Sequence, residues 1–140
     1  MMKTIFALLA IFASASAFVP STSAPVVKTA LSATHESTTL ADLDSKIQNA
    51  ALQNKLTIIN FTATWNPPCR MIGPLYEAVS DEFGSAQFIN VDIDKNPDAA
   101  SKFDISALPT FVFIKGGEEV DQFSGASEAR LKETLAFRER

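Results

Sequence analysis

The sequence predicts an α/β domain in which a mixed β-sheet has helices on both faces. Between residues 39 and 115, segments with apolar residues at helical spacing alternate with short apolar segments typical of strands. Two adjacent glycines, Gly116 and Gly117, then join the last of these strands to another. Alternating strands and helices place helices on both faces of a sheet, and a two-glycine turn makes the final strand pair antiparallel.

A helix, a strand and a second helix are expected in the first half of the domain. Residues 39–54 form the first helix, because five apolar residues share one face: Leu40, Leu43, Ile47, Ala50 and Ala51. The run LTIINF (56–61) is nearly continuously apolar, as in a central parallel strand buried on both faces. The second helix follows WNPP, with Pro74 as a kink and Gly84 as its end.

The second half supplies a strand, a short helix, a hairpin and a closing helix. QFINVDID (87–94) alternates apolar and polar residues, as a half-covered strand does. A short helix over residues 97–103 leads to the strand LPTFVFIK, and the glycine turn continues into EVDQFSG. Ser127 can cap the last helix, SEARLKETLAF.

Charge divides the chain into two kinds of segment. All sixteen acidic residues lie from Glu36 onward, whereas residues 1–35 carry only Lys3 and Lys28 as charged groups. The domain from residue 36 has no basic stripe and a net negative charge, so the sequence gives no support for nucleic-acid binding.

The first 35 residues have the composition of targeting signals. Lys3, nine apolar residues from Ile5 to Ala13 and the small residues ASA indicate a signal peptide over residues 1–17, too short to span a membrane. Residues 18–35 are rich in Ser, Thr, Ala and Pro and lack acids, which indicates a transit-peptide-like or disordered segment. The junction ASAF, with Phe18 after the cleavage point, resembles the bipartite plastid-targeting presequence of algae with secondary plastids. That resemblance implies a plastid protein without a membrane segment in its mature form; the alternative is secretion.

The supply of cysteine and histidine limits the possible chemistry. Cys69 is the only cysteine, which rules out an intrachain disulfide, and His35 is the only histidine. A Cys/His metal cluster therefore cannot be assembled, and we expect neither a metal nor a cofactor.

Residues 36–140 carry motifs that resemble the thioredoxin family. The matching stretches are FTATW, PPCRMIGP, VDIDKNP and LPTFVFIKGGE, followed by Gly125. The resemblance implies the thioredoxin fold for a domain over residues 36–140, and a monomer. The form WNPPCR is most similar to eukaryotic thioredoxins whose site reads WCPPCR or WCGPCR.

The resemblance also shows which parts of the family's reaction differ. Thioredoxins use a first thiol to attack a disulfide and a second, three residues on, to resolve the mixed disulfide. Asn66 stands at the attacking position and Cys69 at the resolving one. Asn60 replaces the family's buried aspartate, and an amide cannot take up the proton. Two parts of one reaction are absent, which predicts that dithiol exchange is lost.

The remaining family landmarks suggest a binding groove. The resemblance implies a cis peptide bond before Pro109 and a mostly apolar surface that pairs with an extended peptide. Its outline consists of Trp65, Pro67, Pro68, Ile93, Ala107, Leu108, Pro109 and Gly125. For Trp65 a packing role, and for Pro109 an architectural one, remain open.

Two functions follow from these residues, and whether the chain is an enzyme stays open. The first is a module that binds a protein or peptide partner in an extended conformation without normal dithiol turnover. The alternative is a monothiol oxidoreductase that uses Cys69 to form a mixed disulfide or a glutathione adduct in cell redox homeostasis. Cys69 could also be a small packed apolar residue.

Overall fold

The computed structural model describes residues 33–140. The predicted signal peptide (1–17) and almost all of the transit-like segment (18–35) lie outside the described residues. Within the described part, no helix is long and apolar enough to cross a membrane.

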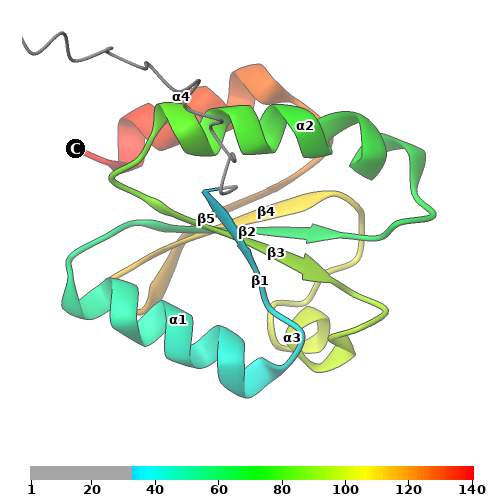
Figure 1. The fold of residues 1–140 in the computed structure, drawn as a ribbon, viewed down its shortest axis with the longest axis horizontal. Helices are drawn as coiled ribbons and strands as arrows, with labels where there is room; N and C mark the ends of the chain where they lie inside the picture. The colour runs from blue at the N-terminus through cyan, green and yellow to red at the C-terminus, as the bar shows by residue number, and fades with distance from the viewer. Residues whose placement is uncertain (1–32) are drawn as a thin grey trace, which may run out of the picture.

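One mixed sheet of five strands forms the centre of the described part (Figure 1). The strands are β1 (Thr34–Glu36), β2 (Thr57–Thr62), β3 (Gln87–Asp92), β4 (Thr110–Lys115) and β5 (Glu118–Ser124). They lie in the order β1-β3-β2-β4-β5. The pairs β1·β3 and β2·β3 are parallel, whereas β2·β4 and β4·β5 are antiparallel. The mixed sheet and the final hairpin were both predicted, and both are confirmed.

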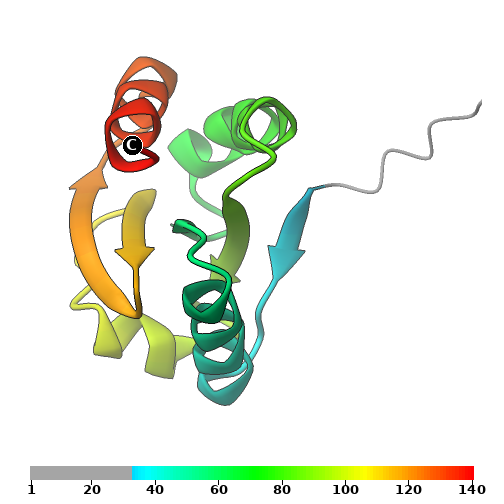
Figure 2. The same ribbon diagram turned by 90° about the vertical axis from the view of Figure 1, so that its left-hand side faces the viewer.

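Helices cover both faces of the sheet. They are α1 (Leu40–Leu52), α2 (Pro67–Glu82), α3 (Pro97–Lys102) and α4 (Glu128–Arg138). In Figures 1 and 2, α2 and α4 lie on one side of the sheet, and α1 and α3 lie on the other. The predicted layering is therefore confirmed.

Two apolar clusters fill the spaces between the sheet and the helices. On one face, Tyr76 and Val79 of α2 and Leu131 of α4 pack with Phe88 and Phe111 of the sheet. On the other face, Leu43 and Ile47 of α1 and Ala99 of α3 pack with Ile59 of β2 and Val91 of β3. Because successive side chains of a strand point to opposite faces, β2 must be apolar on both, and this explains the run LTIINF.

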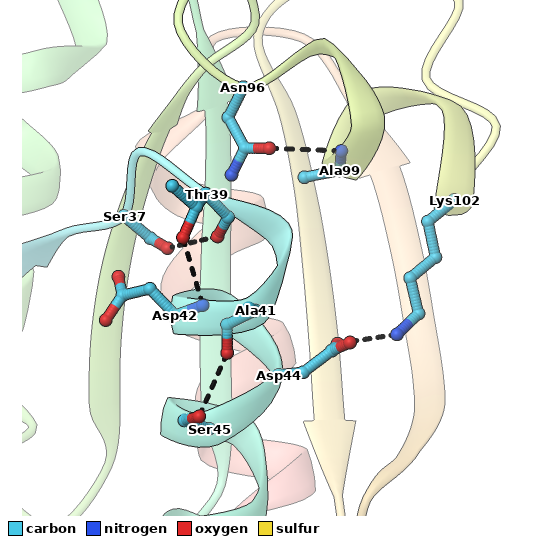
Figure 3. Close-up of polar contacts among 9 residues, drawn as sticks. All are labelled: Ser37, Thr39, Ala41, Asp42, Asp44, Ser45, Asn96, Ala99 and Lys102. Carbon is cyan, nitrogen blue, oxygen red and sulfur yellow. Dashed lines mark hydrogen bonds and ion pairs between the residues drawn. The ribbon is translucent and has the colours of Figure 1, made fainter.

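Side-chain caps and one ion pair fix the ends of α1 and α3 (Figure 3). Thr39 Oγ1 accepts a hydrogen bond from the N–H of Asp42 at 3.2 Å, which caps α1. Asn96 Oδ1 likewise accepts from the N–H of Ala99 at 3.3 Å and caps α3. Lys102 Nζ lies 2.5 Å from Asp44 Oδ1, so an ion pair joins the two helices (Figure 3).

The sequence analysis did not predict β1. Thr34–Glu36 pairs with β3 in parallel, with Thr34 opposite Phe88, and this pairing begins two residues before the predicted domain boundary at residue 36. Three polar residues at a sheet edge carry no apolar pattern, so no periodicity in the sequence indicates this strand.

Candidate functional site

Asn66 caps the helix that begins the site. Its Oδ1 accepts a hydrogen bond from the backbone N–H of Cys69 at 3.1 Å. Pro67 and Pro68 fill the first two helical positions and have no N–H, so Cys69 contributes the first donor of α2. The next donor, the N–H of Arg70, reaches Asn66 O at 3.2 Å. The first turn of α2 therefore has no unpaired donor, and the residue at the attacking position acts as an N-cap.

Cys69 lies inside the protein. Its residue is 3% exposed and its thiol is free. It stands in the first turn of α2, three residues after the cap. A reagent can therefore reach the sulfur only when the residues that cover it move. The family resemblance implies the same shielding for a thiol at the resolving position.

Asn60 forms an amide pair in the middle of the sheet. It is 2% exposed, stands opposite Asn90 in the parallel β2·β3 register, and donates from Nδ2 to Asn90 Oδ1 at 3.1 Å. Asn60 Oδ1 is buried and has no hydrogen-bond partner within the described residues. Neither amide takes up a proton at working pH, so the site has no buried proton acceptor at residue 60.

A shallow cleft brings half of the predicted groove together. Trp65, Ile93, Ala107 and Leu108 line a cleft of about 340 Å³. Asn66, already named as a site residue, also lines the cleft, together with three residues that the sequence did not indicate: Ala100, Ile105 and Ser106. These three belong to α3 and the loop after it, and no sequence pattern distinguishes them from core or surface positions.

Trp65 lies at the edge of this cleft and is held in place by a hydrogen bond. Its Nε1–H donates to Asp94 Oδ2 at 2.9 Å, while 62% of the residue remains exposed. A large apolar ring that is fixed at one end and open to solvent can contact a partner at little entropic cost, because its rotamer is already restricted. Such exposure favours contact over the packing role that remained open for Trp65.

The other predicted groove residues do not line the cleft itself. Pro67 and Pro68 are exposed at the start of α2. The Leu108–Pro109 bond is cis, as the family resemblance implied, and Pro109 is buried. Pro109 O accepts from the N–H of Gly125 at 2.9 Å, and Gly125 has a φ of +112°, which favours glycine. Pro109 and Gly125 thus join the loops next to the cleft.

No group of three or more His, Cys, Asp or Glu side chains in residues 33–140 is arranged to hold a metal ion.

Comparisons with known proteins find relatives that are similar in sequence and in fold. A family model described as thioredoxin matches residues 24–136. Thioredoxin from Gallus gallus is 41% identical over 96 residues, which cover 69% of this chain and 90% of that protein. Thioredoxin H4 from Arabidopsis thaliana is 46% identical over 88 residues, or 62% of this chain and 74% of that protein. Among solved structures, Fasciola hepatica thioredoxin superposes with a TM-score of 0.71 at 44% identity, covering 74% of this chain and 97% of the other.

Proposed function

Because the chain belongs to the thioredoxin family, we propose that it is a binding or regulatory module that holds a protein partner without normal dithiol–disulfide turnover. The observation that carries the proposal is the position of the single sulfur. Cys69 is the only cysteine of the chain, and it is buried behind an asparagine cap. Resolution of a mixed disulfide within one chain needs a second thiol, and this chain has none.

The amide pair inside the sheet supports the same proposal. A buried base would have to take up the proton when the resolving thiol ionises. Asn60 instead donates a hydrogen bond to Asn90. The nucleophile and the base are both replaced by amides, which is what we expect of a chain that no longer needs the exchange reaction.

The cleft beside Trp65 supports retained binding. Its walls are mostly apolar, and Trp65 stands fixed and exposed at the edge. We propose that it accepts a protein or peptide segment in an extended conformation, as the wall of Ala107 and Leu108 before the cis-proline suggests. We expect the chain to act as a monomer.

Reduction of insulin disulfides tests the loss of turnover. We expect the full chain, supplied with a chemical reductant or a thioredoxin reductase, to accelerate insulin reduction no more than a cysteine-free Cys69→Ser variant does. A rate close to that of an ordinary thioredoxin would overturn the proposal. Titration of extended peptides, followed by the fluorescence of the only tryptophan, Trp65, measures binding separately.

The alternative function is a monothiol oxidoreductase. It is favoured by the retention of Cys69 at the start of α2, next to the exposed Arg70. In this reaction the Cys69 thiolate attacks the disulfide of oxidised glutathione, forms one mixed disulfide and releases one glutathione thiolate. Mass spectrometry after incubation with oxidised glutathione tests it, because an adduct that forms on the folded chain within minutes supports the alternative, and its absence removes it.

We propose a plastid location, on the basis of the sequence alone. The apolar run, the ASAF junction and the acid-free segment over residues 18–35 support it. A fluorescent protein fused after residue 35 in an alga with a secondary plastid is expected to reach the plastid. Appearance in the medium would support secretion instead.

A further inference from the structure

A second cavity lies on the other side of the sheet from the apolar cleft, beneath α2. Its volume is about 180 Å³, and its walls come from β1, β2 and β3, the residues that follow these strands, and the middle of α2. A water molecule occupies about 30 Å³ of the liquid, so the cavity has room for a group of several heavy atoms. The lining residues are polar apart from one glycine: Glu36, Ser37, Thr38, Asn60, Thr62, Thr64, Gly73, Glu77, Asn90, Asp92 and Lys95.

The wall of this cavity includes a buried group that lacks a partner. Asn60 lines the cavity and is 2% exposed, and its Oδ1 has no hydrogen-bond partner among the described residues. A buried acceptor without a partner is unfavourable, so the site favours a molecule that brings a donor.

The charges around the cavity indicate the sign of that molecule. Glu36, Glu77 and Asp92 contribute three carboxylates, and Lys95 contributes one ammonium group. Within the described residues the carboxylates of Glu36 and Glu77 make no hydrogen bond or ion pair, and neither does the side-chain ammonium of Lys95. Asp92 Oδ1 accepts from the N–H of Asp94 at 2.9 Å. The cavity therefore combines unused acceptors with an excess of negative charge.

We propose that this cavity binds the guanidinium group of an arginine from the protein partner. A guanidinium has five N–H donors in one plane and no acceptor, which suits a site with several amide and carboxylate oxygens. A lysine ammonium offers three donors from one atom and satisfies fewer of these oxygens at once. The inference adds a chemical preference to the proposed function, since it depends on a protein partner for the source of the arginine.

Binding at the apolar cleft and binding at the polar cavity change different spectroscopic signals, so the two proposals can be tested separately. The apolar cleft contains Trp65, whose fluorescence responds to binding there. The cavity contains the side-chain amides of Asn60 and Asn90, which nuclear magnetic resonance resolves individually. If only the fluorescence of Trp65 fails to respond to binding, the proposed function fails. If only the amide resonances fail to respond, the proposal for the cavity fails.

The experiment titrates the ¹⁵N-labelled full chain with N-acetyl-arginine amide and follows those two side-chain amides. We expect saturable shifts with this probe, and shifts at least about tenfold weaker with the neutral isostere N-acetyl-citrulline amide. Equal shifts with both probes, or no saturable shift at tens of millimolar, would overturn the proposal. Tighter binding of free arginine than of the capped form would also overturn it, because the site would then take an amino acid rather than a protein side chain.

Two variants of α2 locate the site without disturbing the core. Glu77→Gln is expected to weaken binding by about tenfold, the lower end of the effect of one hydrogen bond to a charged group, whereas Glu118→Gln on the exposed hairpin removes the same charge without effect. Gly73 lines the cavity, and a Cβ there meets no atom within 4 Å. We therefore expect Gly73→Leu to fold and to block the probe, and Gly84→Leu, which also has open space, to bind it normally. Binding unchanged in both Glu77→Gln and Gly73→Leu would place the probe elsewhere and contradict the assignment.

Discussion

The side chain of Asn66 accepts a hydrogen bond from the backbone N–H of Cys69 at 3.1 Å, so the residue at the attacking position caps the helix that carries the remaining thiol. The two prolines between them have no N–H to offer. Asn66 therefore accepts hydrogen bonds from the first two N–H groups of α2, the first through its side-chain oxygen and the second through its main-chain carbonyl oxygen. Asparagine is one of the preferred N-cap residues, so the side chain at this position stabilises the start of α2.

We predict that Asn66→Ala lowers the free energy of unfolding by about 1 kcal/mol, because the N–H of Cys69 loses its acceptor. Urea denaturation followed by circular dichroism measures the change. Asn66→Asp is the matched control: its carboxylate accepts the same hydrogen bond and favours the positive end of the helix, so stability should equal or exceed that of the original chain. Equal stability of the alanine and aspartate variants would show that the cap contributes nothing.

Restoring both missing groups is predicted to restore exchange in two steps. Asn66→Cys creates WCPPCR and should reduce insulin slowly, because residue 60 still offers no base. Addition of Asn60→Asp should raise that rate by about tenfold or more, since positioned general bases contribute up to 10²–10⁴-fold.

The control for this pair is Asn60→Asp alone, which has a base but one thiol and should remain inactive. If the double variant also fails to reduce insulin, the cleft beside Trp65 does not present substrates as it does in related proteins. Loss of the cap in Asn66→Cys should make that variant less stable, so folding is checked in the same samples by circular dichroism.

The fold was predictable from the sequence wherever apolar residues repeat at a regular spacing. The spacing in α1 and α2 and the continuous run in β2 correctly indicated helices around a mixed sheet. The strand β1 was missed because its three residues carry no such repeat, and they pair with β3, which lies far away along the chain. The motifs shared with the thioredoxin family supported the rest of the fold prediction.

The site was predictable only in part. Sequence motifs placed Asn66, Cys69 and Asn60 at their family positions, and an asparagine before two prolines is a typical helix start, but the hydrogen bond to Cys69 appears only in three dimensions. The pairing of Asn60 with Asn90 depends on the register of two strands 30 residues apart along the chain. The polar cavity was missed for the same reason, since four separate segments contribute to it.

Cys69 is predicted to be protected from alkylation in the folded chain. At 3% exposure the sulfur can react with iodoacetamide only when the start of α2 opens locally, so labelling should be at least about tenfold slower than in the urea-unfolded chain. Quenched time points analysed by mass spectrometry give both rates, with a single modification site to count. Comparable rates would mean that the thiol is open to reagents, and would strengthen the monothiol alternative.

Tyr76 is predicted to limit stability at alkaline pH. Its side chain is fully buried, and its hydroxyl lies 3.0 Å from both Ile58 O and Ile89 O. Burial raises the pKa of Tyr76 well above 10.0, although the hydrogen bond to Ile89 lowers it in part. The unfolded chain loses this proton near pH 10 while the folded chain keeps it, so the stabilisation is complete below that pH and falls as the pH rises further.

Because Tyr76 is the only tyrosine, tyrosinate absorbance should appear together with unfolding in a pH titration. Tyr76→Phe should cost about 1–3 kcal/mol at neutral pH, since two buried carbonyls lose a donor, and should make the alkaline decline shallower. Tyrosinate absorbance that rises near pH 10 while the chain is still folded would contradict this account.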